Sequence, residues 1–226
     1  MQISKETIDI LKNFASINSN ILIRKGKVLS TISTAKNIYA RAEVAEDFPE
    51  EVAVYDLNSL LALLTLMENQ TVDFGEKSLT MSKDNGKFEY FYSAPNVIVA
   101  APAKEIEIDS HYEFKLTAED VNMIMKAAAI TGAPTITISS KGENVTLTIG
   151  DKKNDTANTY KKIIGTSEHS FDCHMAVENF KIVPMHIMLQ SRKRKHFSLS
   201  TQQNHWGILS QWNQIRWYNY EHISNI

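Results

Sequence analysis

Three side chains of types that bind metal ions lie close together in the sequence: His169, Cys173 and His174. A structural zinc site takes four such ligands, usually from two pairs at defined spacings. No second pair stands at such a spacing from this cluster. We therefore interpret the three residues as parts of a strand and of the start of the following element, and we expect no bound metal.

Motifs that organise catalysis are also missing from the sequence. It contains no Walker loop, no G-x-G-x-x-G, no G-x-S-x-G and no H-E-x-x-H. The acids of AEDFPEE, Ala45 to Glu51, are more typical of a solvated loop than of a catalytic carboxylate pair. The sequence thus predicts a protein that is not an enzyme and that uses no cofactor.

Charge is distributed unevenly along the chain, whose formal net charge is -2. The segment from Met185 to Ile226 has one acid, Glu221, and the following basic residues: Arg192, Lys193, Arg194, Lys195 and Arg216. The body of the chain before this segment is therefore net acidic. Such a body argues against a protein that coats DNA through an overall positive charge, although it leaves room for a local basic face.

Two similar helical segments occur half a chain apart. SKETIDILKNFASIN, Ser4 to Asn18, and TAEDVNMIMKAAAIT, Thr117 to Thr131, each lead into β-rich sequence with a Lys-Gly turn. Ser4 is a good N-cap, and Thr117 with Asp120 resembles a capping box. The repeat predicts two domains of similar architecture within 226 residues.

Each of these helices is predicted to have one buried and one exposed side. In the first helix, Lys5 and Lys12 lie opposite the apolar rows, and in the second helix Lys126 lies on the exposed side. The inward-facing residues expected in the second helix are Val121, Ile124, Met125 and Ala128. Lysines therefore mark the exposed side of both helices.

Alternating apolar residues predict antiparallel hairpins in both halves. We expect one hairpin around Lys25-Gly26 and its counterpart around Lys141-Gly142, and we expect Asn85-Gly86 to form a type I′ turn. The sequence therefore predicts an α+β protein with antiparallel sheets.

A further helix is expected after Asp56, a good N-cap. The sequence that follows it, up to Met67, is apolar on almost every side, so we expect this helix to be sandwiched in packing. HSFDCHMAVENFKIVP, residues 169–184, stands at the equivalent place in the second half. Two repeated units would thus contain two sheets and four helices.

The two domains are predicted to meet in a connector. APNVIVAAPAKEIEIDSHYEF, Ala94 to Phe114, contains two prolines between patterned regions and is expected to be extended. The predicted domains are residues 1–110 and residues 111–226.

Four strings in this order resemble the sliding clamps of T-even-type bacteriophages, over about residues 1–184. They are LKNFASINSNILIRKGKVL, VAVYDLNSLLALLTLM, NVIVAAPAKEIEI and LTAEDVNMIMKAAAI. The resemblance implies two tandem clamp-type domains per subunit and a head-to-tail homotrimeric ring. In such a ring the sheets lie outside and the helices line a hole threaded by duplex DNA.

The resemblance also implies a function in the cytoplasm of the infected bacterial host. The ring would tether the phage DNA polymerase for processive replication, would be opened by an ATP-driven clamp loader, and would act with late transcription factors as a mobile activator. A ring holds DNA by topology, so it needs no sequence readout and only a modest positive inner face. Lys5, Lys12 and Lys126 are the residues expected to face the DNA.

Partners of this family dock a short hydrophobic peptide near the interdomain connector. By position, the residues expected to flank such a pocket are Val97, Ile98, Val99 and Pro102. A connector that simply packs these apolar residues onto a sheet is the alternative interpretation.

The resemblance stops after Pro184. A shift of two nucleotides within Trp206 to Arg216 allows Gly-Tyr-Phe-Val-Ala-Val-Glu, then Pro or Ser, Asp or Asn, and Ser. That string is similar to the closing strand and acidic tail of the family. We therefore interpret residues 185–226 as frame-shifted.

Two other classes of function stay open from the sequence alone. One is a β-rich protein-interaction module that never encircles DNA. The other is a direct DNA binder that uses the basic tail around RKRK, Arg192 to Lys195.

Overall fold

The computed structural model describes residues 1–67, 69–104, 112–154, 156–180, 187–192, 196–201 and 215–219. The chain divides into two compact units, Met1–Glu105 and Ile106–Ile226. This division lies inside the predicted connector and a few residues before the predicted boundary. No helix in the described residues is long and apolar enough to cross a membrane.

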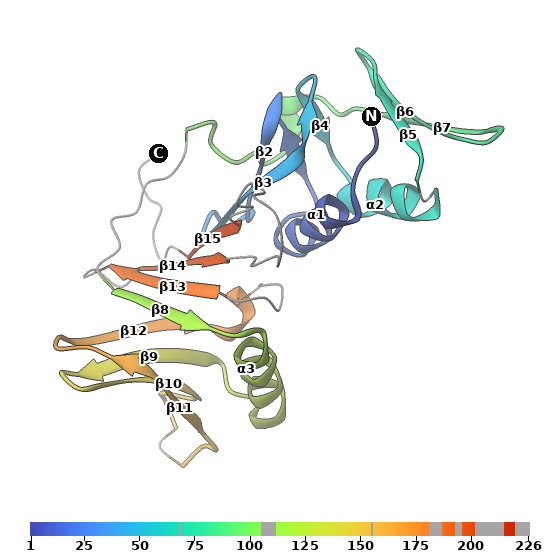
Figure 1. Ribbon diagram of the computed structural model, residues 1–226. Helices are drawn as coiled ribbons and strands as arrows, with labels where there is room; N and C mark the ends of the chain where they lie inside the picture. The colour runs from blue at the N-terminus through green and yellow to red at the C-terminus, as the bar shows by residue number, and fades with distance from the viewer. Residues whose placement is uncertain are drawn as a thin grey trace, which may run out of the picture. The chain divides into compact units, whose positions relative to one another are not determined.

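The first unit begins with helix α1 and contains a second helix, α2, which lies beside α1 (Figure 1). Its elements, in order, are α1 (Lys5–Ile17), β1 (Ile21–Ile23), β2 (Gly26–Ile32), β3 (Ile38–Phe48), β4 (Val52–Val54), α2 (Leu57–Leu66), β5 (Thr71–Phe74), β6 (Ser78–Lys83), β7 (Gly86–Phe91) and a 3-10 turn (Pro95–Val97). Large apolar side chains from helices and strands, including Phe14, Leu29 and Phe48, are almost completely buried. Their burial supplies most of the drive that orders this unit.

The turn at Lys25-Gly26 is present, but the strands on its two sides do not pair with each other. Gly26 has φ 109°, a conformation that a glycine adopts without strain. β1 then pairs with β4, whereas β2 pairs with β3 through the next turn. The predicted hairpin was therefore wrong, because β1 takes a partner more distant in the sequence and β2 pairs with the strand that follows it.

Strands β5, β6 and β7 form an antiparallel sheet whose last two strands make a long hairpin (Figure 1). The hairpin loop is Asp84-Asn85, with Asp84 at φ 51°, because Lys83 pairs directly with Gly86. The predicted turn at Asn85-Gly86 is thus displaced by one residue. Gly86 instead opens β7.

Within its described residues, the second unit contains one α-helix and strands on both sides of it in sequence. Its described elements are β8 (Tyr112–Leu116), α3 (Ala118–Thr131), β9 (Thr135–Lys141), β10 (Asn144–Gly150), β11 (Tyr160–Thr166), β12 (Ser170–Ala176), a 3-10 turn (Val177–Asn179), β13 (Ile187–Arg192), β14 (His196–Thr201) and β15 (Ile215–Asn219). β9 and β10 form the hairpin predicted around Lys141-Gly142, with Gly142 at φ 94°. The sheet order there is β11-β10-β9-β12.

The predicted fourth helix is not found within the described part of the chain. Residues 170–176 form strand β12, and only the short 3-10 turn Val177–Asn179 follows. The equivalent stretch of the first unit, LNSLLALLTL, is rich in leucine, which favours a helix. Residues 181–186 lie outside the described residues. The expectation of two sheets is also wrong, because the described strands of the first unit alone belong to three different sheets.

The stretch interpreted as frame-shifted contains strands where the structure describes it. β13 pairs with β8 and with β14, and β14 pairs with β15, all antiparallel. Most of the segment Trp206 to Arg216, on which the frame-shift interpretation rests, lies outside the described residues. The interpretation therefore stays a prediction.

Candidate nucleic-acid interface

Helix α1 has the two-sided character that its sequence predicts. The Ser4 hydroxyl caps it by accepting a hydrogen bond from the Thr7 backbone N–H at 3.2 Å. The buried side consists of Thr7, Ile10, Leu11, Phe14 and Ile17. Lys5 and Lys12 are exposed on the opposite side, because residues three and four apart share one helix face.

A carboxylate from strand β3 holds the start of α1. Glu46 accepts hydrogen bonds from the Ser4 backbone N–H and from the Thr7 hydroxyl, each at 2.5 Å. Although burial opposes ionisation, the hydrogen bonds from Thr7 and Ser4 lower the pKa of Glu46. Glu46 therefore does not lie in a solvated loop, as the sequence suggested for residues 45–51, but in a strand with its carboxylate buried.

The start of helix α3 is capped by a carboxylate from the helix itself. Thr117 and Asp120 form the capping box that the sequence predicts. Lys162 of β11 forms a salt bridge with Asp120. Although burial opposes ionisation, the hydrogen bonds from Lys162 and Thr117 lower the pKa of Asp120.

The exposed side of α3 is more apolar than expected. Lys126 is exposed there, but so are Met125, at 42%, and Ile130, at 84%. Met125 was predicted to face inward. It lies instead at the edge of the exposed side, because the buried side centres on Val121, Ile124 and Ala128.

Basic and acidic side chains balance on the exposed sides of α1 and α3. The exposed charged residues of these two helices are Lys5, Glu6, Asp9, Lys12, Glu119 and Lys126. Lys12 forms an ion pair with Asp9 at 3.4 Å. Helix α2 has no charged residue. The exposed formal charges therefore sum to zero on α1 and, separately, on α3, and the expectation of a modest positive inner face stays a prediction.

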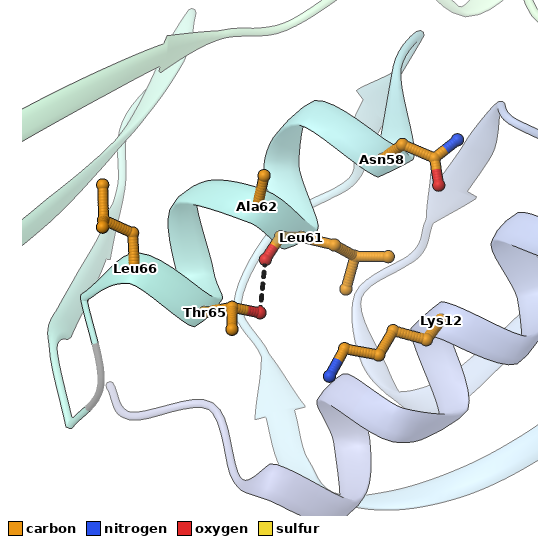
Figure 2. Close-up of a pocket in the computed structure, with 6 residues that line it drawn as sticks. All are labelled: Lys12, Asn58, Leu61, Ala62, Thr65 and Leu66. Atoms are coloured by element: carbon orange, nitrogen blue, oxygen red, sulfur yellow. Dashed lines mark hydrogen bonds between the residues drawn. The ribbon is translucent and has the colours of Figure 1, made fainter.

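A groove of about 590 Å³ lies between α1 and α2 (Figure 2). It is lined by Lys12, Asn58, Leu61, Ala62, Thr65 and Leu66. α2 buries only one side, made of Leu57, Leu60, Leu61 and Leu64, whereas Leu66 is 71% exposed. The prediction that α2 is sandwiched on all sides was therefore wrong, and its open side forms one wall of the groove.

The connector residues divide between the surface and the interior. Val97 is 56% exposed, whereas Ile98 is buried with Leu22 and Ala53. Val99 and Pro102 are half-buried, and the Val99 carbonyl accepts a hydrogen bond from the Asn18 amide at 3.1 Å. Their role in binding a partner stays a prediction.

The possible metal ligands do not converge. Cys173 is buried, while His174 points to the other face of β12, where Nε2 lies 3.0 Å from an Asp172 oxygen. His169 precedes the strand. In the part of the chain that the structure describes, no group of three or more His, Cys, Asp or Glu side chains could hold a metal ion.

Comparisons with known proteins assign the chain to a family. The sequence profile described as DNA polymerase processivity factor matches residues 4–100. A sliding clamp of Vibrio phage KVP40 is 32% identical over 174 residues, which cover 74% of this chain and 79% of that relative. The chain belongs to the phage sliding-clamp family.

Further sliding clamps match over most of their length. The clamp of Escherichia phage RB69 is 30% identical over 193 residues, and that of Enterobacteria phage T4 is 28% identical over 191 residues. Each alignment covers 81% of this chain and 84% of the relative. The predicted resemblance is confirmed, and the chain is a viral processivity factor of DNA replication.

Solved clamps share the fold at low sequence identity. The proliferating cellular nuclear antigen (PCNA) of Entamoeba histolytica has a TM-score of 0.68 at 15% identity, covering 94% of this chain and 93% of its own. A PCNA2-PCNA3 complex of Sulfolobus tokodaii gives 0.67 at 12%, covering 94% of each chain. A. fulgidus PCNA, solved with the C-terminal region of FEN-1, gives 0.69 at 10%, covering 97% and 96%. The predicted α+β clamp fold is confirmed.

Sequence reasoning missed the structural role of several residues. Glu46 looked like one acid among several in a loop, and only its strand alternation within EVAEDF hinted at an inward direction. Asn58 and Leu66 looked like parts of a fully packed helix. Nothing in the sequence around Lys162 indicated its salt bridge, because its partner Asp120 is distant in sequence.

Proposed function

We propose that this clamp is a head-to-tail homotrimer that closes a ring around duplex DNA. The ring tethers the phage DNA polymerase and slides without reading sequence. The single observation that carries the proposal is that each unit has an edge strand with exposed apolar side chains.

The edge in the first unit is β7. Among the described residues this strand pairs only with β6, so its other edge has backbone groups available for a further strand. Phe91 is 68% exposed and Phe88 is 40% exposed. A strand with these features is a natural surface for pairing with another chain.

The edge in the second unit is β11. It is the first strand in the order β11-β10-β9-β12, and Ile163 on it is 60% exposed. β7 and β11 have similar lengths, six and seven residues. Glu89 on β7 and Lys161 on β11 are both exposed and have opposite charges.

Pairing of β7 from one copy with β11 from the next joins two different surfaces. Such a heterologous contact repeats from copy to copy and closes into a ring when the rotation per copy divides a full turn. Both edges would then be paired, which removes the tendency of open strands to aggregate.

The ring places helix surfaces toward the DNA. Lys5, Lys12 and Lys126 are the residues proposed to contact phosphates there. Because acidic neighbours balance them, each contact is weak, and the hold on DNA is topological.

The other partners follow from the family. Partner peptides of the polymerase and of the clamp loader dock beside the connector, where Val97 is exposed and Val99 and Pro102 are half-buried. Ile98 supports this surface from below. The clamp acts in the cytoplasm of the infected bacterial host and serves there as a mobile activator of late transcription.

The test combines solution mass with DNA retention. Light scattering after size exclusion should give the mass of three chains of 25.6 kDa. The protein is then mixed with linear DNA whose biotinylated ends are afterwards blocked by streptavidin. We expect retention on the blocked DNA and release when a restriction enzyme cuts it.

Two results would overturn the proposal. A monomeric mass at every concentration would leave a non-ring interaction module. Retention that does not depend on blocked ends would indicate direct DNA binding.

A further inference from the structure

Few contacts hold the connector to the first unit. Within the described part of the chain, residues 98–104 belong to no helix or strand, and no backbone–backbone hydrogen bond ties them to the rest of the unit. Ile98 packs with Leu22 and Ala53, and Ala101 is also buried. A segment without a ladder of backbone hydrogen bonds depends for its position on its few remaining contacts.

One of these contacts comes from Arg24, directly after strand β1. Its Nη2 donates a hydrogen bond to the Ala101 carbonyl at 2.7 Å, across 77 positions of sequence. Its Nε lies 3.9 Å from a carboxylate oxygen of Glu51, a second contact that restricts the orientation of the guanidinium. Because a charged donor makes a stronger hydrogen bond than a neutral one, Arg24 is a firm tie to this end of the connector.

The other contact comes from Asn18, the residue that ends helix α1. Its side-chain amide donates to the Val99 carbonyl at 3.1 Å and to the Ile32 carbonyl, at the end of β2, at 2.8 Å. Its side-chain oxygen accepts a hydrogen bond from the Asn20 backbone N–H at 2.9 Å. The residue is buried, and both amide hydrogens and the oxygen have partners, so the orientation of the side chain is fixed.

The two ties hold the stretch that is proposed to bind partner peptides. Val97 is exposed there, and Val99 and Pro102 are half-buried. A connector that is free to move must be ordered when a peptide binds, and the lost entropy lowers the affinity. A connector that is held in place beforehand avoids this cost.

We propose that Arg24 and Asn18 are positioning residues, which hold the Ala101 and Val99 carbonyls and so keep the docking surface formed before a partner arrives. The inference rests on the proposed function, since it takes the connector as the docking site. It goes further by naming two residues outside the connector that set the affinity for partners.

The first measurement follows the connector without a partner. Cys173 is the only cysteine and is buried, so Val97→Cys can be labelled selectively with a nitroxide. In paramagnetic resonance spectra the label should become more mobile after Arg24→Met, which removes the donors and keeps an apolar side chain. Lys25→Met is the matched control, because it removes the same charge from the exposed neighbouring residue, and it should leave the mobility unchanged.

The second measurement is the affinity for a partner, with Val97 unaltered. The probe is a fluorescent synthetic peptide with the C-terminal sequence of the phage's own DNA polymerase, and anisotropy reports its binding. Arg24→Met should weaken binding roughly three- to tenfold, the effect of losing one hydrogen bond. Arg24→Lys should recover part of the loss, because its ammonium can still donate to the Ala101 carbonyl.

A variant of the second anchor adds an independent arm. Asn18→Asp keeps an acceptor for the Asn20 N–H but removes both donors, so it should weaken peptide binding at least as much as Arg24→Met. Since Asn18 also ends α1, circular dichroism first checks that this variant folds. If it does not fold, the Arg24 variants decide.

The outcomes separate the anchors from the docking function. Equal label mobility in Arg24→Met and Lys25→Met would show that Arg24 does not hold the connector. A mobile label with unchanged peptide affinity, or an equal loss of affinity in Lys25→Met, would overturn the role of the anchor in docking. If the unaltered protein does not bind the peptide, the proposed docking at the connector fails, and label mobility still decides whether Arg24 holds the connector.

Discussion

Glu46 and Thr7 are joined by a hydrogen bond of 2.5 Å between a buried carboxylate and a hydroxyl. The bond ties strand β3 to the first turn of α1, across 39 positions of sequence. The same carboxylate accepts the Ser4 backbone N–H, so one side chain satisfies two donors at the helix start. The position of the exposed face of α1, with Lys5 and Lys12, therefore depends on a residue in a strand.

Glu46→Gln is expected to destabilise the first unit. Hydrogen bonds to a charged acceptor are worth more than neutral ones, so the free energy of unfolding should fall by about 1–3 kcal/mol at neutral pH. The lowered pKa of Glu46 means that its stabilising effect is complete above the pKa of an unfolded glutamate and is lost as pH falls through the folded value. Urea unfolding at a series of pH values should show the unaltered protein and the variant converging in acid. An equal difference at all pH values would contradict this account.

The salt bridge between Lys162 and Asp120 should contribute less than the cap that Asp120 forms. Lys162 is 45% exposed, so we expect Lys162→Met to cost only about 0.2–1 kcal/mol. Asp120→Ala also removes half of the capping box and should cost about 1 kcal/mol more. Thermal unfolding of both variants checks the order. A larger loss for Lys162→Met would show that the bridge to β11 dominates.

Assembly should be sensitive to charge on either strand edge. Phe91→Asp or Ile163→Asp places a carboxylate where we propose a strand from the next copy to pack, so each variant should be monomeric by light scattering. Leu66→Asp is the control, since Leu66 is as exposed as Phe91 but lies on helix α2. If all three variants keep the mass of the unaltered protein, neither edge takes part in assembly.

Binding to linear DNA with open ends should depend only weakly on salt. The balanced charges of α1 and α3 leave few phosphates to neutralise, so the slope of log K against log salt should be about -1 to -3. A protein held by its basic tail through five or more phosphates would give a slope of about -5 or steeper. Fluorescence anisotropy over a range of salt concentrations distinguishes the two.

The reading frame after Pro184 should decide how well the ring closes. We expect a version with the frame restored to give a trimer at lower concentration than this chain, because the native closing strands would complete the second unit. Light scattering of both proteins side by side provides the comparison. Equal assembly of the two would show that residues 185–226 do not limit ring closure.

Helix α1, helix α3 and the β9–β10 hairpin could be predicted because their signals are local. N-caps, helical spacing of apolar residues and a Lys-Gly turn all act within a few positions of sequence. The exposed positions of Lys5, Lys12 and Lys126 followed from the same periodicity.

Pairings that depend on distant partners could not be predicted in this way. Whether β1 pairs with β2 or with β4 depends on which strand buries more surface against it, and that is decided only when the whole unit packs. The same holds for the burial of Glu46 and for the open side of α2.

The sequence by itself determined the family, through four strings that resemble phage sliding clamps. It also determined the repeat of the helices and the lysine-bearing faces, because N-caps and helical periodicity act over a short range. Only the tertiary structure decided that the exposed charges on those faces sum to zero, that Glu46 caps α1, and that a groove with Lys12 and Asn58 lies between two helices. The physical reason is that hydrogen bonds, ion pairs and grooves join residues that are far apart in the chain. Their energies depend on distance in space.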